Sequence, residues 1–132
     1  MNKDKIRAIV NAALKNPWIN GTTAILDGDP FMALEYELTE ESFSVIGDPE
    51  ELAEKLSQCG WALNTAFIYG EFAFINQVNG GCEWAVFKFN PETETAFQFE
   101  SITGDWMGKE EILEFLQRIE KATDEQLRKL EY

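Results

Sequence analysis

Carboxylates are the side chains whose number and spacing in this sequence point most directly to an interaction. The chain carries 24 Asp and Glu against 11 Lys and Arg, with no His, for a formal net charge of −13. Ten acidic residues fall within residues 27–54, which contain no Lys or Arg: Asp27, Asp29, Glu35, Glu37, Glu40, Glu41, Asp48, Glu50, Glu51 and Glu54. Like charges at this density repel one another, and a basic partner would relieve that repulsion. A solvated acidic face that serves only solubility is the alternative interpretation.

The local pattern favours a regular anionic surface. Glu35 and Glu37 alternate along a predicted strand, which places both carboxylates on one side about 6.6 Å apart. Four further carboxylates crowd a predicted helix start after residue 47. Such a surface fits the Lys/Arg channel of a nucleic-acid-binding protein and competes there with phosphates. Trp106, in a predicted loop, is the residue type that often anchors such contacts.

In size and charge the chain is similar to the small acidic DNA-mimic inhibitors of phages and mobile elements, anti-CRISPR and anti-restriction proteins among them. The resemblance implies a non-enzymatic inhibitor or regulator whose partner is a basic nucleic-acid-binding protein. Direct binding to nucleic acid is not expected, because the phosphates would meet net repulsion. No family motif accompanies the likeness, so it assigns no functional residue.

The sequence lacks the residues that several kinds of catalytic site require. Without His there is no Ser-His-Asp or Cys-His relay and no His-containing zinc site, and two Cys are too few for an all-Cys site. Neither common nucleotide-binding glycine motif occurs. The carboxylate pairs Asp27–Asp29 and Glu92–Glu94 fall in predicted turns, where water keeps a carboxyl pKa from rising. We therefore expect no catalytic residues, no metal and no cofactor.

A second candidate site is the predicted hairpin around residues 76–84. Asn76 and Gln77 lie on opposite faces of a strand, so one amide points toward the interior and requires hydrogen-bond partners. With Glu83 and Trp84 they are candidates for binding a small ligand. The alternative is that these side chains stabilise the hairpin and its Asn79-Gly80-Gly81 turn.

A third interpretation is an accessory or immunity-type protein that uses an aromatic surface around Trp18, Trp84 or Trp106. A homodimer is compatible with it, and its binding would be nearly insensitive to salt.

The elements that position these groups follow from hydrophobic periodicity. Apolar spacing predicts helices over 3–16, 48–59 and 109–122, with a short last helix from Thr123, and a connection over 103–108. Alternation predicts a strand over 32–39 and a four-strand antiparallel meander over 61–102. The fold class is α+β, an antiparallel sheet of about five to seven strands with all helices packed on one face. Six phenylalanines are expected to form one core wall: Phe72, Phe74, Phe87, Phe89, Phe97 and Phe99.

The length of 132 residues fits a single globular domain. No apolar stretch approaches the roughly 20 residues of a membrane span, and the N-terminus lacks the apolar run of a signal peptide. A cytoplasmic location is therefore expected, with Cys59 and Cys82 reduced.

Overall fold

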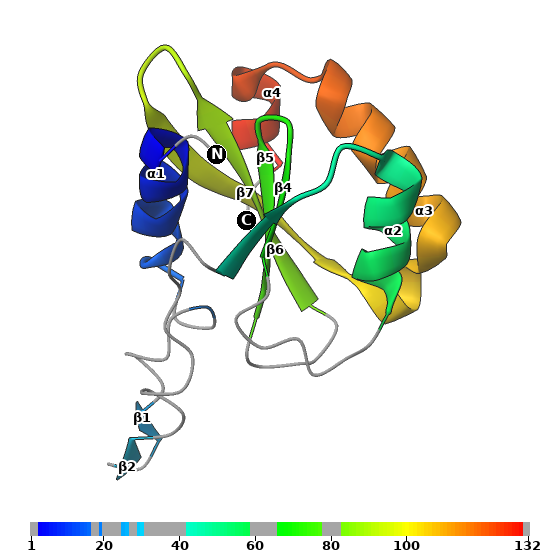
Figure 1. Cartoon of the computed structure of the whole chain (residues 1–132), viewed down its shortest axis with the longest axis horizontal. Coiled ribbons are helices and arrows are strands. Elements are labelled where there is room, and N and C mark those ends of the chain that lie inside the picture. Colours follow the sequence, from blue (N-terminus) through cyan, green and yellow to red (C-terminus); the bar gives the residue numbers. More distant parts are fainter. Residues whose placement is uncertain are drawn as a thin grey trace.

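Five strands form the main sheet of the computed structural model, in the order β3-β4-β5-β6-β7 (Figure 1). Their bounds are Phe43–Val45, Ala66–Tyr69, Phe72–Asn76, Glu83–Asn90 and Thr95–Thr103. The structure describes residues 3–16, 19, 25–26, 29–30, 42–58, 66–77 and 83–130. A separate antiparallel pair joins β1, Ile25–Leu26, to β2, Asp29–Pro30. The predicted strand over 32–39, the Asn79-Gly80-Gly81 turn, Trp18 and both cysteines lie outside the described residues.

The predicted meander is confirmed: β4, β5, β6 and β7 pair in sequence order, each antiparallel to the next. The exception to antiparallel pairing is β3, which pairs parallel to β4. Parallel neighbours need a crossover connection, and helix α2, Pro49–Ser57, lies in the chain between them. The fold is α+β, as the sequence indicated, with a mostly antiparallel sheet.

The helices lie on both faces of the sheet, which corrects the expectation of a single covered face. Helix α1, Lys3–Ala13, packs Ile6 and Ile9 against one face. Helix α2, helix α3 (Gly104–Lys121) and helix α4 (Asp124–Arg128) cover the other, around Leu52 and Leu116 (Figure 1). Residues of the central strands are buried on both sides, so both faces need a cover.

The six phenylalanines do not form one wall. Phe72, Phe74, Phe97 and Phe99 belong to the core under α2, α3 and α4, whereas Phe87 and Phe89 belong to the core under α1. The register is the reason, because Phe72 pairs with Lys88 and Phe74 with Val86. Directly paired residues share a face, so the phenylalanines of β6 point away from those of β5.

Local signals set the starts of α2 and α4. The Asp48 side chain accepts a hydrogen bond from the Glu50 amide at 3.1 Å, and Pro49 occupies the first turn. At α4, Thr123 caps the predicted helix start and forms a capping box with Gln126. Both predicted helix starts are confirmed.

Helix α3 begins earlier than predicted. The expected connection over 103–108 is helical from Gly104, and a kink at Gly108, with φ of 74°, separates this first turn from the longer helix that follows. Gly104 lies against the end of α2, where a Cβ atom would stand 1.8 Å from the Leu56 carbonyl oxygen. The close approach of the two backbones was not visible in the local sequence. None of the described helices is long and apolar enough to cross a membrane.

Candidate functional site

Of the ten carboxylates in residues 27–54, the structure describes the side chains of four: Asp48, Glu50, Glu51 and Glu54. All four are exposed: Asp48 caps α2, Glu50 and Glu51 lie in its first turn, and Glu54 follows in the next turn. Five others lie outside the described residues: Asp27, Glu35, Glu37, Glu40 and Glu41. For Asp29 in β2 and Trp106 in α3, the description is limited to the backbone. The prediction of one continuous surface over 27–54 therefore stays a prediction.

Helical geometry explains why α2 directs these carboxylates outward. Leu52, Ala53 and Leu56 are buried against the sheet, and the remaining positions of the helix face water. Acidic groups near a helix N-terminus also interact favourably with the helix dipole. Among the ion pairs that join described residues, none includes a carboxylate of α2. These negative charges are therefore available to a partner.

Helix α3 carries a second group of exposed carboxylates, which sequence reasoning missed. It packs beside α2 (Figure 1), and its residues Glu110, Glu111 and Glu114 are exposed. Seven carboxylates form what we call the α2–α3 acidic surface: Asp48, Glu50, Glu51, Glu54, Glu110, Glu111 and Glu114. Two exposed bases, Lys55 and Lys109, lie in the same stretches of helix. The available signal was the spacing of Ile112 and Leu116, which turns the three glutamates outward.

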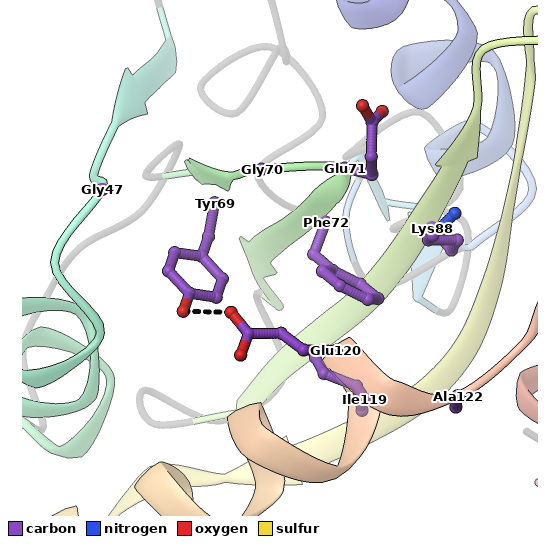
Figure 2. A pocket seen from close by; sticks show the side chains of 9 residues that line it. All are labelled: Gly47, Tyr69, Gly70, Glu71, Phe72, Lys88, Ile119, Glu120 and Ala122. Carbon is purple, nitrogen blue, oxygen red and sulfur yellow. Dashed lines mark hydrogen bonds between the residues drawn. The ribbon is translucent and has the colours of Figure 1, made fainter.

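A cavity of about 470 Å3 lies where the β4–β5 turn meets the end of α3 (Figure 2). Its lining comes from β4, β5, β6, the segment before α2 and the end of α3: Gly47, Tyr69, Gly70, Glu71, Phe72, Lys88, Ile119, Glu120 and Ala122. Gly70 takes the left-handed backbone conformation, with φ of 58°, that the two-residue turn requires. The cavity adjoins the α2–α3 acidic surface, because Gly47 directly precedes Asp48 and Glu120 belongs to α3.

One hydrogen bond crosses the cavity. The Tyr69 hydroxyl donates to Glu120, whose side chain extends from α3 toward the ring (Figure 2). Burial, this hydrogen bond and the negative charges of Glu120 and Asp48 raise the pKa of Tyr69 from 10.0 to about 12. Tyr69 therefore remains a neutral hydrogen-bond donor at physiological pH and does not act as a base.

Lys88 is held on the opposite side of the cavity. Its ammonium group donates to Asp124 at 3.0 Å and to the Phe89 carbonyl at 3.1 Å, and lies 5.9 Å from the Phe72 ring centroid. The Lys88 side chain is 15% exposed and that of Asp124 is 29% exposed. The positive charge of Lys88 is thus compensated by a close carboxylate.

Helix α1 contacts the outer side of the same turn. Lys5 donates to the Gly70 carbonyl, and its ammonium nitrogen lies 3.8 Å from Glu71 Oε2. That oxygen is buried and accepts no hydrogen bond from the described residues. The Glu71 carboxylate points away from Tyr69 and Phe72 (Figure 2), so it belongs to the rim of the cavity rather than to its centre.

The hairpin residues proposed for a small ligand are occupied by contacts within the protein. Gln77, 2% exposed, accepts from Asn16 at 3.1 Å and donates to Ser101 at 2.8 Å and to Glu83 at 3.4 Å. The Asn16 amide also donates to Gln98 at 2.9 Å. Both amides are buried rather than one, because helices cover both faces of the sheet, and Gln77, just after β5, links β7 to Asn16 beyond the end of α1.

Asn76 and Trp84 are buried as well, at 3% and 1% exposure. Asn76 donates to the Glu83 carbonyl at 3.4 Å. The Trp84 indole N–H donates at 3.0 Å to the Leu56 carbonyl near the end of α2. Trp84 therefore supports the core under α2 and is not an exposed aromatic anchor.

Comparison with known proteins finds no family model, no curated protein and no solved structure that matches this chain. Within the described part of the chain, no group of three or more Cys, Asp or Glu is placed to hold a metal ion.

Proposed function

We propose that this protein is a non-enzymatic inhibitor or regulator that binds a basic, nucleic-acid-binding protein through the α2–α3 acidic surface. The observation that carries the proposal is the set of exposed carboxylates on two neighbouring helices. Those of α2 have no ion-pair partner among the described residues. Charges without an internal partner are available to lysines and arginines of another protein.

The mechanism is competition for a positively charged groove. A groove built for phosphates attracts a negative surface over long range and speeds its association. Once the acidic helices occupy the groove, nucleic acid is excluded. A net charge of −13 also disfavours direct binding of this protein to DNA or RNA. Such a mechanism requires no catalytic group and no cofactor.

A charge-matched pair of triple variants tests the proposal. Glu50→Gln/Glu51→Gln/Glu54→Gln removes three charges of α2 and leaves the Asp48 cap in place. The control Glu92→Gln/Glu94→Gln/Glu125→Gln makes the same change in net charge at exposed positions of the β6–β7 turn and α4. Protamine, an arginine-rich protein that binds DNA, serves as the basic probe, with affinity measured by titration calorimetry.

Removing the three α2 charges should weaken binding about three- to 150-fold at low salt, from roughly 0.2–1 kcal/mol for each charge. The control triple should bind nearly as tightly as the parent. Raising the salt from about 0.05 M to about 0.5 M should remove most of the difference. Equal affinities of the two triples would mean that net charge alone attracts the probe, and the proposed surface would be wrong.

A capture experiment then addresses the biological partner. Immobilised parent and both triples are exposed to cell lysate, and the retained proteins are identified and assayed for binding to duplex DNA. We expect retention by the parent and the control triple, and displacement of DNA from the retained protein by the parent. A retained protein that holds DNA and this chain simultaneously would contradict competitive inhibition.

A further inference from the structure

The cavity between the β4–β5 turn and the end of α3 has the chemistry of a receptor for a planar cation. Tyr69 and Phe72 line the cavity but are mostly buried in the core, at 8% and 5% exposure, so only a small part of each ring reaches it, whereas the exposed Glu120 brings a carboxylate into it (Figure 2). An aromatic face and a carboxylate together favour an ammonium or guanidinium group. The volume of about 470 Å3 falls in the range of sites that bind small molecules.

The Glu120 carboxylate can accept further hydrogen bonds. One oxygen, Oε1, accepts from the Tyr69 hydroxyl, and no other described residue donates to this carboxylate. The Tyr69 hydrogen bond orients the group across the cavity. A carboxylate can accept from two donors at once, which matches the paired N–H groups of a guanidinium.

The electrostatic field inside the cavity also favours a cation. Glu120 and Asp48 both disfavour the negative form of Tyr69, and the same field attracts a positive group. Lys88 is the cation that lines the cavity, and its charge is compensated by Asp124 at 3.0 Å. The Lys88 ammonium already lies 5.9 Å from the Phe72 ring centroid.

The location connects the cavity with the proposed interface. Gly47 at its edge is followed by Asp48, the first carboxylate of the α2–α3 acidic surface, and Glu120 lies on the same helix as Glu114. A basic partner lying over α2 and α3 would therefore bring its side chains to the mouth of this cavity. Arginine suits the site better than lysine because its planar head can bind the Glu120 carboxylate with two N–H groups.

We propose that this cavity receives an arginine side chain of the basic partner protein, paired with Glu120 beside the small exposed parts of Tyr69 and Phe72. This inference rests on the proposed function, and it adds a specific anchor to an otherwise general electrostatic attraction. The cavity would then select among basic partners by the position of one arginine.

The experiment uses Nα-acetyl-arginine amide as the probe and its uncharged isostere Nα-acetyl-citrulline amide as the ligand control. Binding is followed by amide shifts in the 15N-labelled protein. The arginine probe should shift the amides of Gly47, Gly70 and Ala122, and the citrulline probe should not. Equal shifts with both probes, or no shifts at these amides, would overturn the inference.

Two variants localise the effect. Glu120→Gln should weaken binding of the arginine probe about threefold or more, whereas Glu92→Gln, a matched change at an exposed position of the β6–β7 turn outside the cavity lining, should have no effect. Gly47→Leu should fill the space: a Cβ atom there meets nothing within 4 Å, and its backbone lies outside the left-handed region. If Gly47→Leu keeps the parent's melting temperature but no longer shows the amide shifts caused by the arginine probe, the probe binds in the cavity. If Gly47→Leu still shows these shifts, the inference is contradicted.

The outcome is separable from that of the proposed function. The α2 triple variant leaves the lining of the cavity intact. It should therefore bind the arginine probe as tightly as the parent does, while its affinity for protamine falls. If protamine binding depends on the α2 charges but the arginine probe never reaches the cavity, the anchor is wrong and the acidic surface stands. If the probe binds the cavity while the α2 triple binds protamine like the parent, the proposed surface is wrong.

Discussion

The contact between Gly104 and the end of α2 offers the sharpest test of how this fold holds its acidic helices together. In Gly104→Ala, the new Cβ atom would stand 1.8 Å from the Leu56 carbonyl oxygen and 2.9 Å from its carbonyl carbon. Non-bonded heavy atoms meet at roughly 3.5 Å. The backbone of α2 or α3 must therefore move by more than an ångström, since neither contacted atom belongs to a flexible side chain.

The cost has two parts. Overpacking a well-packed interior costs about 1–3 kcal/mol. The same carbonyl accepts the Trp84 indole N–H at 3.0 Å, and losing that buried hydrogen bond costs about 1–3 kcal/mol more. We expect Gly104→Ala to lower the free energy of unfolding by about 2–6 kcal/mol. That is a large fraction of the roughly 5–15 kcal/mol of an ordinary domain.

Urea unfolding followed by tryptophan fluorescence measures this loss, with Gly47→Ala as the matched control. A Cβ atom at Gly47 meets nothing within 4 Å, so the control should change stability by less than about 0.5 kcal/mol. The double variant Gly104→Ala/Trp84→Phe should lose less than the sum of the single losses, because both act on the Leu56 carbonyl. A Gly104→Ala protein as stable as the control would refute the close packing of α2 on α3.

Two further predictions concern hydrogen bonds that reach across the fold. In the folded protein the pKa of Tyr69 is raised from 10.0 to about 12. Neutral Tyr69 therefore stabilises the folded state below pH 10, and this stabilisation is lost as the pH rises toward 12. Tyr69→Phe should remove this loss between pH 10 and 12, together with the tyrosinate transition of highest midpoint, and should cost about 0.5–1.5 kcal/mol at neutral pH. If the variant instead lost a tyrosinate transition near pH 10, the raised pKa of Tyr69 would be contradicted. Asn16→Ala removes the donor that reaches Gln77 and Gln98 at 3.1 and 2.9 Å, so thermal unfolding should show a loss of about 1–3 kcal/mol, against little change for the exposed neighbour Lys15→Ala.

Much of the local structure was predictable because its causes lie within a few residues. Asp48-Pro49 marked the start of α2, and the Thr123–Gln126 pair marked the start of α4. Alternating apolar residues marked the meander from β4 to β7. In each case the hydrogen bond or the periodicity that defines the element joins neighbours in the chain, so the amino-acid order alone carries the information.

The candidate site was predictable only in part. The carboxylates of α2 stood out in the sequence because they lie in a stretch without bases. Glu110, Glu111 and Glu114 became part of the same surface only because α3 packs beside α2. The cavity, with Tyr69 and Glu120 separated by 51 residues in the chain, had no local signal.

Sequence by itself determined the kinds of elements in this protein, its large negative charge and the exposed acidic start of its middle helix. The tertiary structure decided which face each phenylalanine takes, that α1 covers the face opposite α2 and α3, and which distant polar groups meet. The physical reason is that strand register and helix placement depend on burying two apolar faces simultaneously. That condition involves the whole chain, and no short segment contains it.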